Sequence, residues 1–195
     1  MRAGLFDLSG KVAAVIGAGS GIGEAVAIGF ADQGAHVACL DINDDGARRV
    51  AARAQANGRS AESARLDVVD SAAVDRIFLD LRSRRGSLDI VVCTPAINVR
   101  KPILQYTDEE ASRVIDVNLK GSFGVLRAAG RIMVEQKHGS IILFSSIRAH
   151  VVEPGQAVYA ATKAGVLQMV KTAAAEFGPH GVRVNAIGPG VGKRR

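Results

Sequence analysis

The sequence predicts a doubly wound α/β domain, in which helices cover both faces of a parallel sheet. Runs rich in Val, Ile, Leu and Ala are nearly continuous, as in strands buried on both faces, and they alternate with helical patterns. The length of 195 residues, 48% of them apolar, fits one domain. A chain of this length buries about 70% of its unfolded surface, so it needs neither disulfides nor a structural metal to hold a core.

The expected elements alternate between strand and helix along the chain. We predict strands at residues 11–17, 36–40, 63–66, 88–93, 140–144 and 182–187. Helices are expected at residues 21–33, 44–57, 71–84, 108–137 and 157–177, of which the fourth is long enough to bend. Because crossovers between parallel strands are right-handed, this order favours a Rossmann-type arrangement with three α/β/α layers.

The charge distribution argues against nucleic-acid binding. Half of the net charge of +6 comes from residues 193–195, so the rest of the chain is only mildly basic. Arg82, Arg84 and Arg85 stand at the end of an expected helix, where they complement the helix dipole. No aromatic residues that could stack on bases accompany them.

The two cysteines, Cys39 and Cys93, each lie in an apolar strand-like run. They are expected to be small buried side chains rather than a disulfide or a metal pair. No apolar run approaches the ~20 residues that span a bilayer, and the first ten residues lack the apolar core of a signal peptide. We therefore expect a soluble, cytoplasmic protein with no metal site and no membrane contact.

A glycine-rich turn stands between the first expected strand and the first helix. Its glycines, Gly17, Gly21 and Gly23, follow the spacing G-x-x-x-G-x-G and not the strict G-x-G-x-x-G. At such a turn, backbone N–H groups can approach a pyrophosphate whose charge the helix N-terminus stabilises. We expect this segment, with Ser20 and Ile22, to bind a dinucleotide. The alternative is an ordinary glycine-rich turn.

Asp41, at the end of the second expected strand, is placed to bind the adenosine ribose. Its carboxylate could accept hydrogen bonds from both ribose hydroxyls, and it would repel a phosphate on that ribose. In the sequence no Arg or Lys accompanies Asp41 or the glycine turn. NAD is therefore favoured over NADP. The alternative is that Asp41 only opens the next turn, since Asn43 and Asp44 follow it.

Tyr159 and Lys163 are four residues apart in a helical pattern, so they share one helix face. An ammonium ~4 Å from a phenol, at an effective dielectric of ~20, is worth about 4 kcal/mol, or about three pKa units. The phenol would then be acidic enough for proton transfer. The alternative is a surface tyrosine beside an extended lysine. Ser146, just after the strand at 140–144, stands at the strand ends where open parallel sheets bind ligands.

Together these residues resemble the classical short-chain dehydrogenase/reductase family over essentially the whole chain. The resemblance covers a glycine motif, an acid that selects NAD, an Asp-Val pair at the adenine, an Asn-Ser-Tyr-Lys tetrad and a Pro-Gly turn. The matching residues are Gly17, Gly21, Gly23, Asp41, Asp67, Val68, Asn118, Ser146, Tyr159, Lys163, Pro189 and Gly190.

The resemblance implies an NAD(H)-dependent oxidoreductase that moves a hydride between the nicotinamide and a secondary alcohol or ketone. Tyr159 would exchange a proton with the substrate oxygen, and Ser146 would donate a hydrogen bond to that oxygen. Lys163 would lower the tyrosine pKa and hold the nicotinamide ribose, while Asn118 would position a water relay. A homodimer or homotetramer is also implied.

Two features depart from the family pattern. Cys93-Thr94-Pro95-Ala96 stands where the family has Asn-Asn-Ala-Gly, so the adenosine wall is expected to be altered. The chain also stops soon after the Pro-Gly turn. We therefore expect residues 1–195 to form a single dinucleotide-binding and catalytic domain that lacks the family's seventh strand and substrate lid. The alternative function is a non-catalytic NAD-binding or oligomerisation module.

The loop between Ser146 and Tyr159 is expected to face the substrate. It carries four polar residues, Arg148, His150, Glu153 and Gln156. These side chains suggest a polar pocket wall, and the alternative is a solvated loop.

Overall fold

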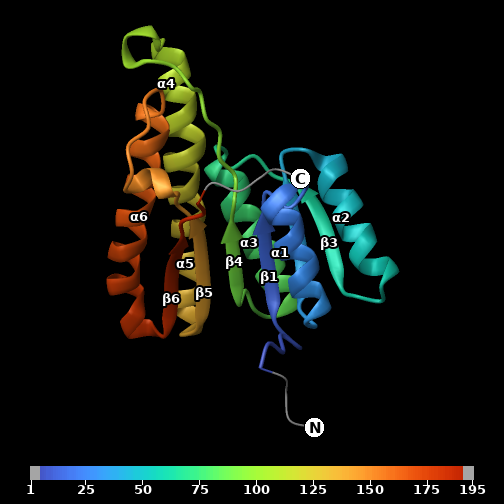
Figure 1. Ribbon diagram of the computed structural model, residues 1–195. Helices are drawn as coiled ribbons and strands as arrows, with labels where there is room; N and C mark the ends of the chain where they lie inside the picture. The colour runs from blue at the N-terminus through green and yellow to red at the C-terminus, as the bar shows by residue number, and fades with distance from the viewer. Residues whose placement is uncertain (1–4, 191–195) are drawn as a thin grey trace.

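The computed structural model describes residues 5–190; the basic residues 193–195 lie outside this range. Six strands form one parallel sheet in the order β3-β2-β1-β4-β5-β6 (Figure 1). They are β1 (Val12–Ile16), β2 (His36–Asp41), β3 (Ala61–Arg65), β4 (Ile90–Cys93), β5 (Gly139–Phe144) and β6 (Val182–Ile187). The strand order reverses between β1 and β4, where open α/β sheets bind ligands.

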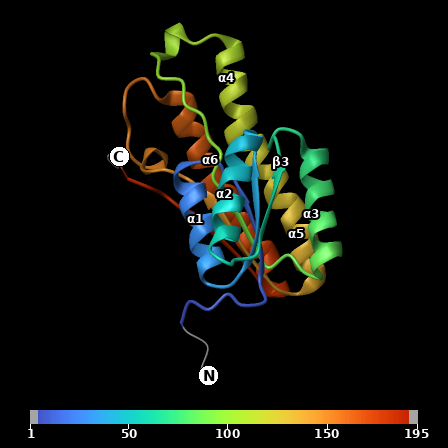
Figure 2. The ribbon, with the colours of Figure 1, turned by 90° about the vertical axis from the view of Figure 1, so that its right-hand side faces the viewer.

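Helices pack on both faces of the sheet, which confirms the predicted doubly wound fold. They are α1 (Gly21–Asp32), α2 (Asp44–Ala56), α3 (Ser71–Arg85), α4 (Asp108–Ile115), α5 (Ser122–Gln136) and α6 (Ala157–Phe177). Ala13 and Val15 of β1 pack in the core cluster of α1 and α2, whereas Val12, Ala14 and Ile16 pack in the cluster of α3, α5 and α6. Figure 2 shows the sheet between α1–α2 and α3–α5.

Two expected elements differ most from the structure, and the other bounds agree within two residues. The helix predicted at 108–137 consists of α4, a π-helical segment (Asp116–Gly121) and α5. A π-helical turn contains one more residue than an α-helical turn, and such turns are frequent at functional sites. The strand predicted at 63–66 begins at Ala61, because its pairing with Val37 on β2 extends the ladder. Within residues 5–190, every helix is too short or too polar to cross a bilayer.

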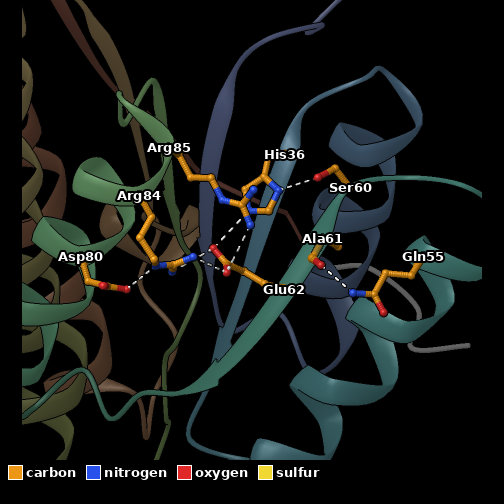
Figure 3. Close-up of polar contacts among 8 residues, drawn as sticks. All are labelled: His36, Gln55, Ser60, Ala61, Glu62, Asp80, Arg84 and Arg85. Atoms are coloured by element: carbon orange, nitrogen blue, oxygen red, sulfur yellow. Dashed lines mark hydrogen bonds and ion pairs between the residues drawn. The ribbon is translucent and has the colours of Figure 1, made fainter.

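A charged cluster joins the edge strand β3 to β2 and α3, and Figure 3 shows Glu62 at its centre. Glu62 accepts hydrogen bonds from two nitrogens of Arg84, at 2.9 and 3.2 Å, and lies 3.5 Å from Arg85. Its Oε1 is 3.1 Å from Nε2 of His36, whose Nδ1 is 2.7 Å from Ser60 Oγ. Arg84 and Arg85, expected only to complement a helix dipole, therefore bind a carboxylate on a distant strand.

Replacing Glu62 with Gln is expected to destabilise the fold by about 1–2 kcal/mol at pH 7, because the partly exposed pair is screened by solvent. Burial alone would raise the pKa of Glu62, but hydrogen bonds from Arg84 and His36 outweigh it and lower the pKa from 4.5 to about 2. The stabilisation is therefore complete above pH 4.5 and is lost as the pH falls toward 2. Urea unfolding of both proteins between pH 7 and pH 2.5 measures it.

The matched control is Glu135→Gln, which breaks the exposed pair that Glu135 forms with Arg82. This pair lies on α3 and α5 and is mostly solvated, so no measurable change in unfolding free energy is expected. A Glu62→Gln variant whose stability equals that of the wild type at pH 7 would contradict the importance of the cluster.

Candidate active site

At the key glycines of the turn, a side chain would be strained or would clash. Gly17 and Gly21 have φ angles of +81° and +56°, in the left-handed region that glycine adopts without strain. A Cβ on Gly23 would lie 1.9 Å from the Gly17 carbonyl oxygen. Ser20 is the N-cap of α1 and makes no side-chain cap hydrogen bond, and Ile22 is half-exposed. The backbone N–H groups that begin α1 can therefore face an anionic ligand.

Asp41 is tied to the glycine turn through the backbone. Its Oδ2 accepts a hydrogen bond from Gly19 N at 2.8 Å, and its Oδ1 accepts one from Asn43 N at 2.9 Å. The turn-forming role and the ligand-binding role of Asp41 are therefore compatible. A carboxylate has about four lone-pair sites, so about two remain for the hydroxyls of a ribose. This arrangement fits an adenosine ribose at the end of β2.

An arginine does contact the glycine turn, contrary to the expectation from sequence. Arg49, on the second turn of α2, donates from Nη2 to the Gly19 carbonyl oxygen at 2.9 Å. It also forms two hydrogen bonds with Glu24 of α1, at 2.8 and 3.1 Å. This contact could not be found from the sequence, because Arg49 and Gly19 are 30 residues apart along the chain. The close packing of α2 on Gly19 brings it there.

Thr94, in the Cys93-Thr94-Pro95-Ala96 segment that departs from the family pattern, supports the start of the glycine turn. Its hydroxyl donates to the Ile16 carbonyl oxygen at 3.0 Å, where β1 ends and the glycine turn begins. A Cβ on Gly17 would lie 2.2 Å from Thr94 Oγ1 and 3.2 Å from Pro95 Cδ. Ala96 does not have a positive φ. The segment is therefore closed tightly against the glycine turn without an asparagine or a second glycine.

The Asp67-Val68 pair reaches the same end of the sheet from the edge strand. Asp67 Oδ1 accepts a hydrogen bond from Val69 N at 3.0 Å. Val68 is buried against the π-helical segment, where a Cβ on Gly121 would lie 2.8 Å from Val68 Cγ2. The pair is thus fixed in place between β3 and the π-helical segment.

Two hydrogen bonds join α6 to the end of β5. Lys163 Nζ donates to the Phe144 carbonyl oxygen at 2.7 Å, and Ser145 Oγ donates to the Lys163 carbonyl oxygen at 2.9 Å. Ser146 follows directly and is 8% exposed. It also caps a 3₁₀ turn, since its Oγ accepts from Arg148 N at 3.2 Å. The serine and the lysine are therefore held at one end of the sheet by contacts between β5 and α6.

Tyr159 lies one helical turn before Lys163, whose Nζ is 5.7 Å from the centre of the tyrosine ring. The lysine ammonium donates its hydrogen bond to the Phe144 carbonyl oxygen rather than to the phenol. Asn118, fully buried in the π-helical segment, donates to Thr162 Oγ1 at 3.2 Å, and that hydroxyl donates to the Tyr159 carbonyl oxygen at 2.7 Å. Asn118 is thus coupled to the same helix.

Asn118 also fixes the segment that follows β4. Its Oδ1 accepts from Ile97 N at 2.8 Å, and its Nδ2 donates to the Ile97 carbonyl oxygen at 2.9 Å. The Asn118 side chain thus joins the π-helical segment to the loop that follows β4. The Pro-Gly turn meets the site from β6, because Ile147 N donates to the Pro189 carbonyl oxygen at 3.1 Å. Gly190, next in the chain, is exposed.

The loop between Ser146 and Tyr159 carries a polar network centred on Glu153. Glu153 accepts from Arg148 and Gln156, and Arg100 lies 3.8 Å away. Gln156 in turn accepts from Asn98 Nδ2 at 2.9 Å. His150 is exposed and lines a cavity of about 360 Å³ together with Ser146. Three of the four expected residues therefore bind one another, and His150 faces the cavity.

Replacing Lys163 with Met is expected to stabilise the fold by roughly 1–3 kcal/mol at pH 7, because Lys163 is buried and its charge is desolvated. Burial lowers the pKa of Lys163 from 10.5 to about 8. Between pH 8 and pH 10.5 the unfolded chain binds more protons than the folded one, so wild-type stability rises with pH there. The Met variant lacks this rise.

Urea unfolding at pH 7 and pH 9.5 measures both effects. Lys171→Met, on the exposed side of the same helix, is the control and should show neither. A Lys163→Met protein that is less stable than the wild type at pH 7 would contradict the desolvation account.

Comparison with known proteins identifies the family. The family model described as enoyl-(acyl carrier protein) reductase matches residues 17–194. The 2,3-dihydro-2,3-dihydroxybenzoate dehydrogenase of Bacillus subtilis (strain 168) is 36% identical over 94% of this chain and 70% of its own length. A short-chain type dehydrogenase/reductase from Mycobacterium marinum is 36% identical with a TM-score of 0.92, over 95% of this chain and 76% of that one.

A third relative was solved with a bound dinucleotide. It is a gluconate 5-dehydrogenase from Burkholderia cenocepacia J2315 in complex with NADP and tartrate. It is 33% identical, with a TM-score of 0.92 over 97% of this chain and 74% of that one. This chain therefore belongs to the short-chain dehydrogenase/reductase family of nicotinamide-dependent oxidoreductases.

Proposed function

We propose that the protein is an NAD(H)-dependent oxidoreductase that interconverts a secondary alcohol and a ketone, with Tyr159 as general acid and base. The observation that carries the proposal is the pair of hydrogen bonds between α6 and the end of β5. They hold Lys163 against Phe144 and Ser145, which directly precede Ser146 in the chain. The glycine turn follows β1 at the same end of the parallel sheet.

Each residue of the tetrad has a role that suits its chemistry. Bound NAD supplies the hydride acceptor. Tyr159 Oη takes the proton of the substrate hydroxyl, or returns it in the reverse direction, and Ser146 Oγ donates a hydrogen bond to the same oxygen. Lys163, whose Nζ is 5.7 Å from the centre of the Tyr159 ring, holds the nicotinamide ribose. Asn118 keeps Thr162 and the Ile97 backbone in place around α6.

The preference for NAD is proposed from Asp41. Its carboxylate has lone pairs left for ribose hydroxyls, and a 2′-phosphate in their place would meet a negative charge. One relative was solved in complex with NADP. The preference of this chain for NAD over NADP is therefore tested by measuring the binding of both dinucleotides. Fluorescence titration should give tighter binding of NADH than of NADPH.

Turnover tests the catalytic part of the proposal. Purified protein is mixed with NAD and a panel of secondary alcohols, polyols and hydroxy acids, and with NADH and the matching ketones. Appearance or loss of NADH absorbance is the expected result. NADH binding without turnover of any compound would favour the alternative, a non-catalytic dinucleotide-binding module.

We further propose that residues 1–195 form a single catalytic domain. Copies of the chain would associate through α5 and α6 into a homodimer or homotetramer. A groove of about 760 Å³ between these helices is mostly apolar, and Phe123 beside it is half-exposed. Apolar patches of this kind mark interaction surfaces. Light scattering should give the mass of an oligomer.

We also propose a cytoplasmic location. Both cysteines are free and buried, as is usual for proteins in a reducing compartment.

A further inference from the structure

Glu24, Arg49 and Arg53 form an ion cluster above the glycine turn. Arg49 donates to both oxygens of Glu24, and Arg53 donates to Glu24 Oε1 at 2.7 Å. Glu24 is 20% exposed, and the Arg49 hydrogen bond lowers its pKa, so it is fully ionised near neutral pH. Two guanidinium groups thus share one carboxylate, and this three-residue cluster carries one excess positive charge.

The cluster lies beside the expected ribose site because Arg49 and Asp41 bind the same residue. Asp41 accepts from the amide of Gly19, and Arg49 donates to the carbonyl of Gly19. The two side chains therefore bind Gly19 on either side, Asp41 at its N–H group and Arg49 at its carbonyl group. A phosphate on the 2′-oxygen of a ribose bound at Asp41 would stand close to the guanidinium of Arg49.

The guanidinium is committed to other partners. Its Nη2 donates to Gly19 and to Glu24 Oε2, and its Nη1 donates to Glu24 Oε1. A free arginine fork is well suited to bind a phosphate through two parallel hydrogen bonds. Glu24 occupies that fork and offsets part of its charge.

We propose that the Glu24–Arg49 ion pair determines the choice between NAD and NADP, in addition to the Asp41 carboxylate. This inference rests on the proposed dinucleotide binding. Glu24 keeps Arg49 paired and so weakens its attraction for a 2′-phosphate. Without the Glu24 charge, Arg49 is free to bind that phosphate, and the site accepts NADP better.

The test compares the ratio of the Kd of NADPH to the Kd of NADH in wild type and Glu24→Gln, by fluorescence titration. The ratio is expected to fall about tenfold in Glu24→Gln. This is the size of effect that one unit charge has on a nearby phosphate when solvent partly screens the interaction. The double variant Glu24→Gln with Arg49→Gln should lose this gain. Arg49→Gln alone should raise the ratio. It removes a positive charge that pairs with Glu24, so the remaining carboxylate charge repels the 2′-phosphate more strongly.

The matched control is Asp32→Asn, at the far end of α1. It makes the same change of charge on the same helix and frees Arg59 instead of Arg49. Its ratio should equal that of the wild type. Melting temperatures establish that each variant is folded, and Arg49→Gln provides an independent test if Glu24→Gln does not fold.

The outcomes separate the inference from the proposed function. A wild type that binds NADH, with an unchanged ratio in Glu24→Gln and in Arg49→Gln, overturns the inference and leaves the proposed function standing. Equal changes in Asp32→Asn and Glu24→Gln, or a gain that persists in the double variant, also overturn it. A folded wild type that binds neither dinucleotide overturns both.

Discussion

Replacing Tyr159 with Phe is expected to lower kcat by about 10³-fold, because the general acid and base is removed. The ring remains beside Lys163, and the described hydrogen bond of Tyr159 is made by its backbone carbonyl, which the substitution retains. The fold should therefore be unchanged, and NADH affinity should change far less than kcat. Steady-state kinetics with any compound that the panel identifies, together with NADH titration, measures both quantities.

Tyr106→Phe is the matched control, since Tyr106 is the other tyrosine of the chain. Its hydroxyl donates to the Val99 carbonyl oxygen and not to a residue of the tetrad. Loss of this hydroxyl should leave kcat within a few-fold of the wild type. Full activity in Tyr159→Phe would remove this residue from the mechanism.

Replacing Gly23 with Ala is expected to weaken NADH binding by more than ~100-fold and to destabilise the fold by about 1–3 kcal/mol. The new Cβ would stand 1.9 Å from the Gly17 carbonyl oxygen, far inside van der Waals contact. This oxygen belongs to the backbone of the turn, so relief requires a shift of the turn itself. NADH titration and urea unfolding measure the two effects.

Gly29→Ala provides the control within the same helix. A Cβ on Gly29 would meet no atom within 4 Å. Alanine is also the better helix former, so a gain of about 0.5–1 kcal/mol in unfolding free energy is expected, with normal NADH binding. If Gly23→Ala bound NADH as well as Gly29→Ala does, the turn could not hold the pyrophosphate as proposed.

The fold could be predicted from sequence because its signals are local. Apolar runs and helical periodicity indicated the alternation of strands and helices, and the bounds of α6 and β6 match the predicted residues 157–177 and 182–187. Buried parallel strands and capped helices leave such patterns within single segments. The π-helical segment was missed because one additional residue in a turn leaves no periodic trace.

The residue types of the site could be predicted, but several partners could not. Spacing along the chain indicated the glycine turn and the Tyr159–Lys163 pair, yet the lysine binds the backbone of Phe144. Arg49 reaches the turn only because α2 packs on Gly19. Long-range contacts of this kind depend on how the elements dock, and a single sequence does not contain that information.

A crystal structure of the protein with NAD would show directly whether the proposed dinucleotide and catalytic sites meet. We expect the pyrophosphate at the N-terminus of α1, the adenosine ribose on Asp41, and the nicotinamide ring between Ser146 and Tyr159. A bound nicotinamide far from these two hydroxyls, or a Tyr159 oxygen directed away from the ring, would contradict this expectation.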